Sequence, residues 1–153
     1  HWDMYAQGAA EVGQPADPSI WRVSRSVLVA DSDAEAQDYL YDPKSGFSHY
    51  YKYFRYSFGR RGVAKMGVND ETMADDDITI DDFKDALPIV GSAKTVLDKM
   101  IALVDETGPF GTLLANGHEW DNPALWQGSM RRLAEDVMPK LSQHADSMRA
   151  AAD

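Results

Sequence analysis

Apolar positions in the first thirty residues change from helical to extended spacing. A helical pattern comes first and ends at Gly13-Gln14-Pro15, a typical helix stop. The segment WRVSRSVLVA that follows is rich in β-branched residues and alternates between two faces. One face holds Val23, Val27 and Val29, and the other holds Ser24, Ser26, Leu28 and Ala30. We therefore predict a helix at the start of the chain and a strand over Arg22–Ala30.

Two helices are predicted next. Ser32 and Glu35 have the spacing of a capping box, which predicts a helix from there to about Tyr41. A second helix is predicted over Phe47–Arg60, because aromatic residues recur there at helical intervals. These residues are Phe47, Tyr50, Tyr51, Phe54 and Phe58.

The rest of the chain contains two short apolar runs, each followed by a helical pattern. After an acidic stretch that predicts only a short helix near Asp81, the runs Pro88–Val90 and Gly111–Ala115 are expected to be buried strands. Ser92 and Asn122 stand where a helix cap is expected, and Gly108 supplies a stop. The tail from Gln143 is expected to fray.

The order of elements is a helix and then three strand-helix units. Apolar strands joined by helical crossovers predict a parallel sheet in an α/β fold. The helices are expected to cover one face of the sheet, and a barrel interior would explain the equally apolar second face. The chain also starts at His1 without an initiator methionine, which suggests a fragment. We therefore expect the C-terminal portion of a (β/α)8 TIM barrel: its last three strand-helix units plus a preceding helix.

Composition narrows the function classes. The net charge of −10, from 25 acidic against 15 basic residues, disfavours nucleic acid and anionic lipid as partners. No cysteine is present, so disulfides, thiolate nucleophiles and cysteine-ligated metals are excluded. No apolar run approaches the roughly 18 residues that a membrane span requires. A cytoplasmic protein without a membrane segment is expected.

Two long segments carry a family resemblance. The order of WRVSRSVLVADSDAEA and IVGSAKTVLDKMIALVDETGPFGTLLANGHEWDNPALWQGSMRRLAEDVMPKL resembles the C-terminal part of bacterial luciferase-like flavin monooxygenases, in the limonene-monooxygenase-like branch. The similarity covers Trp21 to Leu141. It implies that residues 1–153 form the C-terminal part of a single barrel domain, with strands six, seven and eight present and the N-terminal strands absent. Residues 47–86 would be an insertion between strands six and seven.

The resemblance also implies an activity. Members are two-component monooxygenases in which reduced FMN, supplied by a separate flavin reductase, and O2 oxidise a small organic substrate. A deazaflavin is the weaker cofactor option, and a homodimer suits the family. Much of the flavin is held by the missing N-terminal half of the barrel, so the isolated chain is expected to be inactive. The alternative is a non-catalytic assembly module whose aromatic helix and exposed barrel face bind a partner chain.

The cluster Gly117-His118-Glu119-Trp120 follows the last predicted strand, where barrel enzymes build their active sites. His118 is the candidate catalytic residue, because an imidazole titrates near neutral pH and can donate a hydrogen bond or carry a proton. Gly117, Glu119 and Trp120 are candidates for the substrate pocket. In the competing interpretation Glu119 and Asp121 stabilise the start of the last helix, while His118 and Trp120 pack the loop. No His-Glu-x-x-His spacing supports a metal site.

Two further places could contact ligands. Gly91 and Ser92 lie where a strand enters a helix, and helix N-termini attract phosphate, so they are the candidate cofactor-binding residues; Ser92 is equally a plain helix cap. Tyr53 and Tyr56 lie in an aromatic, basic segment and are candidates for the substrate entrance. The aromatic stripe of that segment is more typical of a core or interface face than of nucleic-acid stacking.

Overall fold

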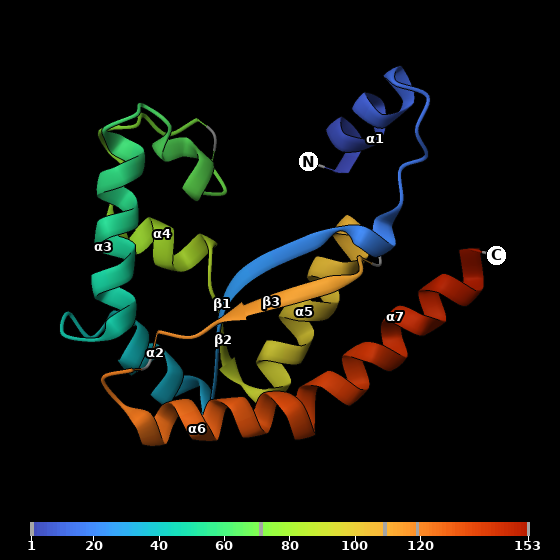
Figure 1. The fold of residues 1–153 in the computed structure, drawn as a ribbon. Helices are drawn as coiled ribbons and strands as arrows, with labels where there is room; N and C mark the ends of the chain where they lie inside the picture. The colour runs from blue at the N-terminus through green and yellow to red at the C-terminus, as the bar shows by residue number, and fades with distance from the viewer. Residues whose placement is uncertain (1, 71, 109, 119, 153) are drawn as a thin grey trace.

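The computed structural model describes residues 2–70, 72–108, 110–118 and 120–152, and its centre is a small parallel sheet flanked by helices (Figure 1). The strands are β1 (Arg22–Ala30), β2 (Ile89–Ser92) and β3 (Thr112–Asn116). The helices are α1 (Trp2–Glu11), α2 (Asp33–Tyr41), α3 (Gly46–Gly59), α4 (Ile80–Ala86), α5 (Ala93–Thr107), α6 (Pro123–Arg132) and α7 (Met138–Ala152). Short 3-10 helices η1 (Pro18–Ile20) and η2 (Ala64–Gly67) and the π-helical turn η3 (Leu133–Val137) complete the chain.

Side chains at the helix starts explain why most predicted boundaries are confirmed. The Ser32 hydroxyl accepts the backbone N–H of Glu35 and caps α2, as predicted. The return bond of the predicted capping box is shifted by one residue, because the Glu35 carboxylate accepts the N–H of Asp31. Ser92 and Asn122 cap α5 and α6. The expectation of a frayed tail is wrong, since α7 continues to Ala152.

The three strands are parallel, but their order differs from that of consecutive barrel strands. Consecutive strands six, seven and eight would place β2 in the middle, whereas the observed order is β2-β1-β3. The nine-residue β1 is long enough to pair with both neighbours. Its N-terminal half, from Arg22 to Ser26, pairs with β3, and its C-terminal half, from Val27 to Ala30, pairs with β2.

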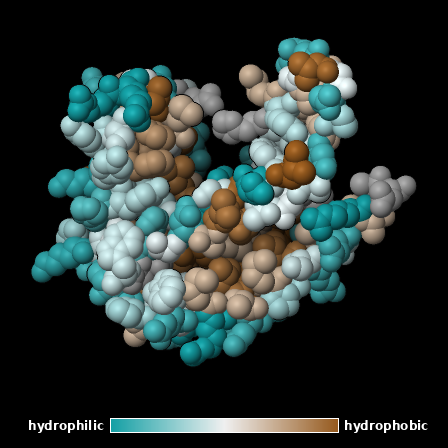
Figure 2. All heavy atoms as spheres, in the orientation of Figure 1, coloured by the Kyte–Doolittle hydropathy of each residue, from teal (hydrophilic) through white to brown (hydrophobic). Residues whose placement is uncertain are grey.

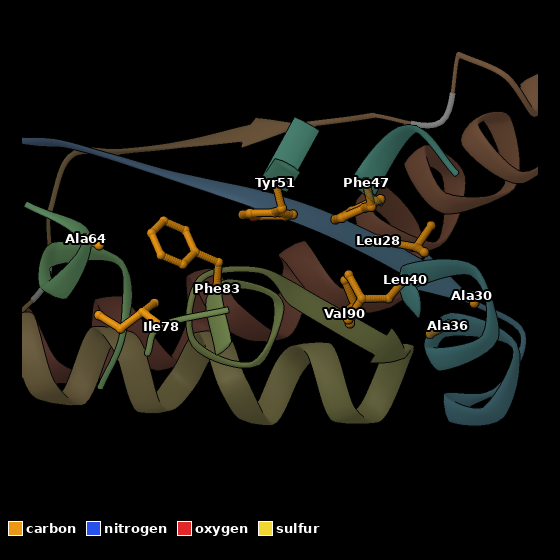
Figure 3. Packing of buried hydrophobic residues seen from close by; sticks show 10 residues of the cluster. All are labelled: Leu28, Ala30, Ala36, Leu40, Phe47, Tyr51, Ala64, Ile78, Phe83 and Val90. Atoms are coloured by element: carbon orange, nitrogen blue, oxygen red, sulfur yellow. The ribbon is translucent and has the colours of Figure 1, made fainter. Parts of the chain in front are cut away.

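Two hydrophobic clusters lie on opposite faces of β1. Val27 and Val29 face α5, η3 and α7 in a cluster completed by Ile89, Val96, Met100, Val104, Leu133, Val137 and Leu141. Leu28 and Ala30 face the other cluster, which Figure 3 shows in close-up; its further members are Ala36, Leu40, Phe47, Tyr51, Ala64, Ile78, Phe83 and Val90. The expectation that helices cover only one face is therefore wrong. Alternation along a strand cannot reveal which distant helices cover each face, and here α2, α3 and α4 cover the second.

β3 is present as predicted, but it is not buried. Leu114 is 47% exposed, and none of the five residues of β3 is fully buried. β3 pairs only with the N-terminal half of β1, whereas both clusters gather along the C-terminal half. Figure 2 shows hydrophobic side chains gathered at the centre of this side of the molecule, around the sheet.

The predicted first helix is confirmed as α1, which lies at the edge of the structure (Figure 1). None of its residues is buried, and its Trp2 ring lies 5.1 Å from the ring of Trp21. Within the described residues, no helix combines the length and the apolar character needed to cross a membrane.

Candidate functional site

His118 lies against the middle of β1. Asn116 at the end of β3 is in register with Ser26, so two further residues bring His118 to the same level of the sheet. Its Nε2 atom lies 2.8 Å from the hydroxyl oxygen of Ser26, and only 5% of the histidine is exposed. The structure thus pairs two buried polar side chains that are 92 residues apart in the chain.

Aromatic rings from α3 enclose the imidazole. The Tyr50 ring stacks on it at 4.1 Å between centroids, and the Phe47 ring meets it edge-on at 5.1 Å. Burial among these rings lowers the pKa of His118 from 6.5 to about 4, because the charged form loses its hydration. The expectation that this imidazole titrates near neutral pH is therefore wrong, since it is uncharged at physiological pH. Its part in catalysis stays a prediction.

A hollow of about 240 Å³ lies beside this pair. It is lined by Ser24, Arg25, Ser26, Tyr50, Tyr51, Phe54, Leu87 and Asn116. The Tyr50 and Phe54 rings are nearly parallel, with centroids 5.3 Å apart, and form an aromatic wall. The Asn116 side-chain amide donates to the Ser24 hydroxyl over 2.7 Å, which ties β3 to β1 on the polar side. The lining of the hollow therefore combines aromatic rings with hydroxyl and amide groups and the Arg25 side chain.

Sequence reasoning missed the residues that line this hollow. Ser24 and Ser26 were visible only as one face of a strand, and Tyr50 only as part of an aromatic stripe. The sheet register brings the serines to Asn116 and His118, and no local spacing encodes that pairing. The alternate positions of Ser24 and Ser26 on one face of β1 were the available signal.

The structure does not bring Tyr53 and Tyr56 to this hollow. Both lie on the opposite side of α3, where their exposed fractions are 63% and 58%. They line a separate surface hollow together with Ser57, Arg60 and Arg61. Helical geometry is the reason, because positions 50, 51 and 54 face the core and positions 53 and 56 then face outward. The interpretation of the aromatic stripe as a core face is confirmed, since Phe47 and Tyr51 are buried and Phe54 and Phe58 pack against them.

Gly117 and Trp120 of the predicted cluster lie at the surface beside His118. Gly117 and Trp120 line an apolar hollow of about 310 Å³ together with Pro123 and Trp126. Trp120 is 63% exposed, so it contributes to the surface there, although its ring meets the edge of the His118 ring at 5.8 Å. Glu119 lies outside the described residues.

At the start of α5, a carboxylate of the chain occupies the place predicted for phosphate. The Asp33 carboxylate accepts the backbone N–H of Ser92 over 2.6 Å and the hydroxyl of Thr95 over 3.0 Å. The hydrogen bond from Ser92 lowers the pKa of Asp33. A Cβ at Gly91 would lie 2.8 Å from the same carboxylate, so glycine permits this close approach. Phosphate contact by Gly91 and Ser92 stays a prediction and requires Asp33 to move. Among the described residues, no three His, Asp or Glu side chains gather as metal ligands.

Known proteins with similar sequence and fold share one chemistry. The chain is 32% identical over 142 residues to 3,6-diketocamphane 1,6-monooxygenase of Pseudomonas putida, and 26% identical over 165 residues to limonene 1,2-monooxygenase of Rhodococcus erythropolis. Among solved structures, it matches the oxygenating constituent of 3,6-diketocamphane monooxygenase from Pseudomonas putida, a type II Baeyer-Villiger monooxygenase in complex with FMN. The TM-score is 0.76 at 31% identity.

The homologues are luciferase-like flavin monooxygenases. The resemblance found in the sequence is thereby confirmed. No family model matches the chain. The alignments cover 92% of the chain for the diketocamphane enzyme and all of it for the limonene enzyme, but only 37% and 40% of those relatives. The structural match likewise covers 92% of this chain and 38% of the other.

We expect the free energy of unfolding to fall on acidification, because His118 is buried in its neutral form. Its pKa in the folded state, about 4, lies below the usual value of 6.5, so the unfolded state takes up this proton first as the pH falls. The contribution is complete above about pH 6.5 and disappears as the pH falls toward 4. We expect a loss on the order of 2–3 kcal/mol between these two pH values. Urea unfolding followed by circular dichroism at several pH values measures it.

The matched control for this pH dependence is His118→Gln, which keeps an amide near the position of Nε2 but does not titrate. Carboxylates such as Asp33 lose their own contributions on acidification in both proteins, and the difference between the two curves cancels them. If the wild-type and His118→Gln curves ran parallel from pH 7 to 4, the buried neutral imidazole would be ruled out.

Proposed function

We propose that this chain is the C-terminal part of a (β/α)8-barrel monooxygenase that uses reduced FMN and O2 to oxidise a small organic substrate. The observation behind the proposal is the match, at 31% identity and a TM-score of 0.76 over 92% of the chain, to a monooxygenase in complex with FMN. Supply of reduced flavin by a separate reductase, and assembly as a homodimer, belong to the same proposal and are supported by the family resemblance.

The hollow beside His118 fits part of a flavin or a small substrate, but not a whole cofactor. Sites for ligands of drug size usually enclose about 300–1,000 Å³, whereas this hollow has about 240 Å³. Its aromatic wall suits a flat ring, and its hydroxyl and amide groups suit the polar edge of such a ring. The remaining contacts would come from the part of the barrel that is not in this chain.

FMN, when bound, supplies the redox chemistry, and the residues of this chain bind and orient. Tyr50 and Phe54 would cover one face of a planar ligand and exclude water from it. The bond from Asn116 to Ser24 directs the lone pairs of Ser24 toward the amide, so the hydroxyl proton of Ser24 can be donated elsewhere. The hydroxyl and amide groups orient a ligand without exchanging protons with it, and Arg25, which also lines the hollow, adds a positive charge.

A chimera tests this proposal. In it, the aligned 92% of this chain replaces the matching 37% of the diketocamphane enzyme of Pseudomonas putida. We expect the chimera to bind FMN, measured by quenching of flavin fluorescence, and to form oxidised product from 3,6-diketocamphane when a flavin reductase is present. The remaining 63% of the relative, expressed alone, is the control for binding by that part. A folded chimera that binds no flavin would exclude the enzyme interpretation.

A further inference from the structure

Three polar side chains form a row beneath the hollow. The Ser26 hydroxyl lies 2.8 Å from Nε2 of His118, and the Tyr51 hydroxyl is also hydrogen-bonded to Ser26. All three are buried, with exposed fractions of 5% for His118, 6% for Ser26 and 2% for Tyr51. Buried polar groups are costly unless they are paired, so this row is held by mutual hydrogen bonds.

The members of the row have different access to a ligand. Ser26 and Tyr51 line the hollow, whereas His118 is not part of its lining. A ligand in the hollow therefore meets the serine and tyrosine, and His118 lies behind them. The imidazole reaches that ligand indirectly, through its hydrogen bond to Ser26 and through its ring contact with Tyr50, which also lines the hollow.

The surrounding aromatic rings hold the His118 imidazole in one orientation, whereas the hydroxyl hydrogen of Ser26 is free to rotate about its C–O bond. The Tyr50 stack at 4.1 Å and the Phe47 edge at 5.1 Å hold the plane of the His118 ring. A serine hydroxyl hydrogen rotates to suit its neighbours, and a neutral imidazole has one nitrogen that donates and one that accepts. With the ring held 2.8 Å from Ser26, the tautomer of the neutral imidazole decides whether the Ser26 hydroxyl donates to Nε2 or accepts from it.

We infer that His118 is a positioning residue that fixes the direction of the Ser26 hydroxyl, and that Ser26 makes the polar contact with a ligand in the hollow. The hydrogen bond between His118 and Ser26 is a property of this chain and does not depend on the proposed activity. The identity of the ligand, flavin ring or substrate, rests on the proposed function. This indirect role is an alternative to the predicted one, in which His118 itself donates a hydrogen bond or carries a proton.

The first experiment uses the 153-residue chain and no ligand. Long-range ¹H–¹⁵N spectra of the histidine side chains report which ring nitrogen carries the proton. We expect a single neutral tautomer for His118, and we expect Ser26→Ala to shift the Nε2 resonance and mix the tautomers. Ser24→Ala is the matched control: it removes a hydroxyl two residues away on the same strand face and should leave the His118 signals in place. Unchanged Nε2 signals in Ser26→Ala would overturn the inference.

A pair of substitutions separates hydrogen bonding from ring packing. His118→Phe keeps an aromatic ring against Tyr50 and loses the bond to Ser26, whereas His118→Gln keeps an amide for that bond and loses the ring. In the chimera, we expect His118→Phe and Ser26→Ala each to raise the KM for 3,6-diketocamphane roughly fivefold, and His118→Gln to stay near wild type. The double variant Ser26→Ala with His118→Phe removes both partners and should lose no more than Ser26→Ala alone.

The opposite ranking, with His118→Phe like wild type and His118→Gln impaired, would show a packing role and overturn the inference. A folded chimera that neither binds flavin nor forms product would contradict the proposed function, and the spectra of the isolated chain would then decide the positioning role by themselves.

Discussion

Replacing Phe83 with alanine is expected to lower the free energy of unfolding by about 3–5 kcal/mol. Phe83 in α4 is fully buried, and its ring meets those of Phe54 and Phe58 at 6.3 Å and 5.8 Å. Figure 3 shows it pointing into the same cluster as Tyr51 and Ile78. Such a loss is a large part of the roughly 5–15 kcal/mol that stabilises a typical domain. Urea unfolding measured by circular dichroism gives the value.

The matched control for Phe83→Ala is Tyr53→Ala, which removes an aromatic side chain that is 63% exposed on α3. It should change the free energy of unfolding by no more than about 0.5 kcal/mol. Residues 47–86 were predicted as an insertion between two strands. An equally small effect of Phe83→Ala would mean that this segment packs only loosely on the sheet.

The second large effect is expected at Gly46, the first residue of α3. A Cβ there would clash with the backbone carbonyl oxygen of His118 and would lie 3.3 Å from a carboxylate oxygen of Asp121. The contact is between the backbone of the His118 loop and the backbone at the start of α3. Backbone atoms cannot rotate away as a flexible side chain could. We expect Gly46→Ala to cost at least about 2 kcal/mol and to disturb the surroundings of His118, measured by urea unfolding and by the imidazole NMR signals.

Gly8→Ala is the control for Gly46→Ala. Gly8 lies within α1, and a Cβ there would meet nothing within 4 Å. Alanine is the better helix former by about 0.8–1.0 kcal/mol, so this variant should be as stable as wild type or slightly more stable. Equal stability of Gly46→Ala and wild type would show that the loop at His118 is free to move away from α3.

Interactions between residues close in sequence allowed much of the fold to be predicted. β1 was predicted with its observed ends, because a run of β-branched residues between a proline-containing loop and a capping serine has few other solutions. The caps at Ser32, Ser92 and Asn122 are formed by side chains that bond residues only three positions away. The family resemblance rested on the order of these segments, and the comparisons confirmed it.

The candidate site could be predicted only in part from the sequence. His118 was selected because it follows a predicted strand. Its low pKa, however, depends on burial against Tyr50 and Phe47, which lie about seventy residues earlier in the chain. Tyr53 and Tyr56 were selected by residue type, and the helix turned them away from the hollow. Ser26 had no local feature that set it apart from Ser24.

The sequence by itself determined most of the local elements and the family resemblance, because helix caps, strand alternation and segment order depend on neighbours within a few residues. Only the tertiary structure decided the sheet order β2-β1-β3, the covering of both faces of β1, and the pairing of Ser26 with His118. The physical reason is that strand register and burial are set by contacts between distant segments. The same imidazole would titrate near neutral pH in a solvated loop, and here burial keeps it uncharged.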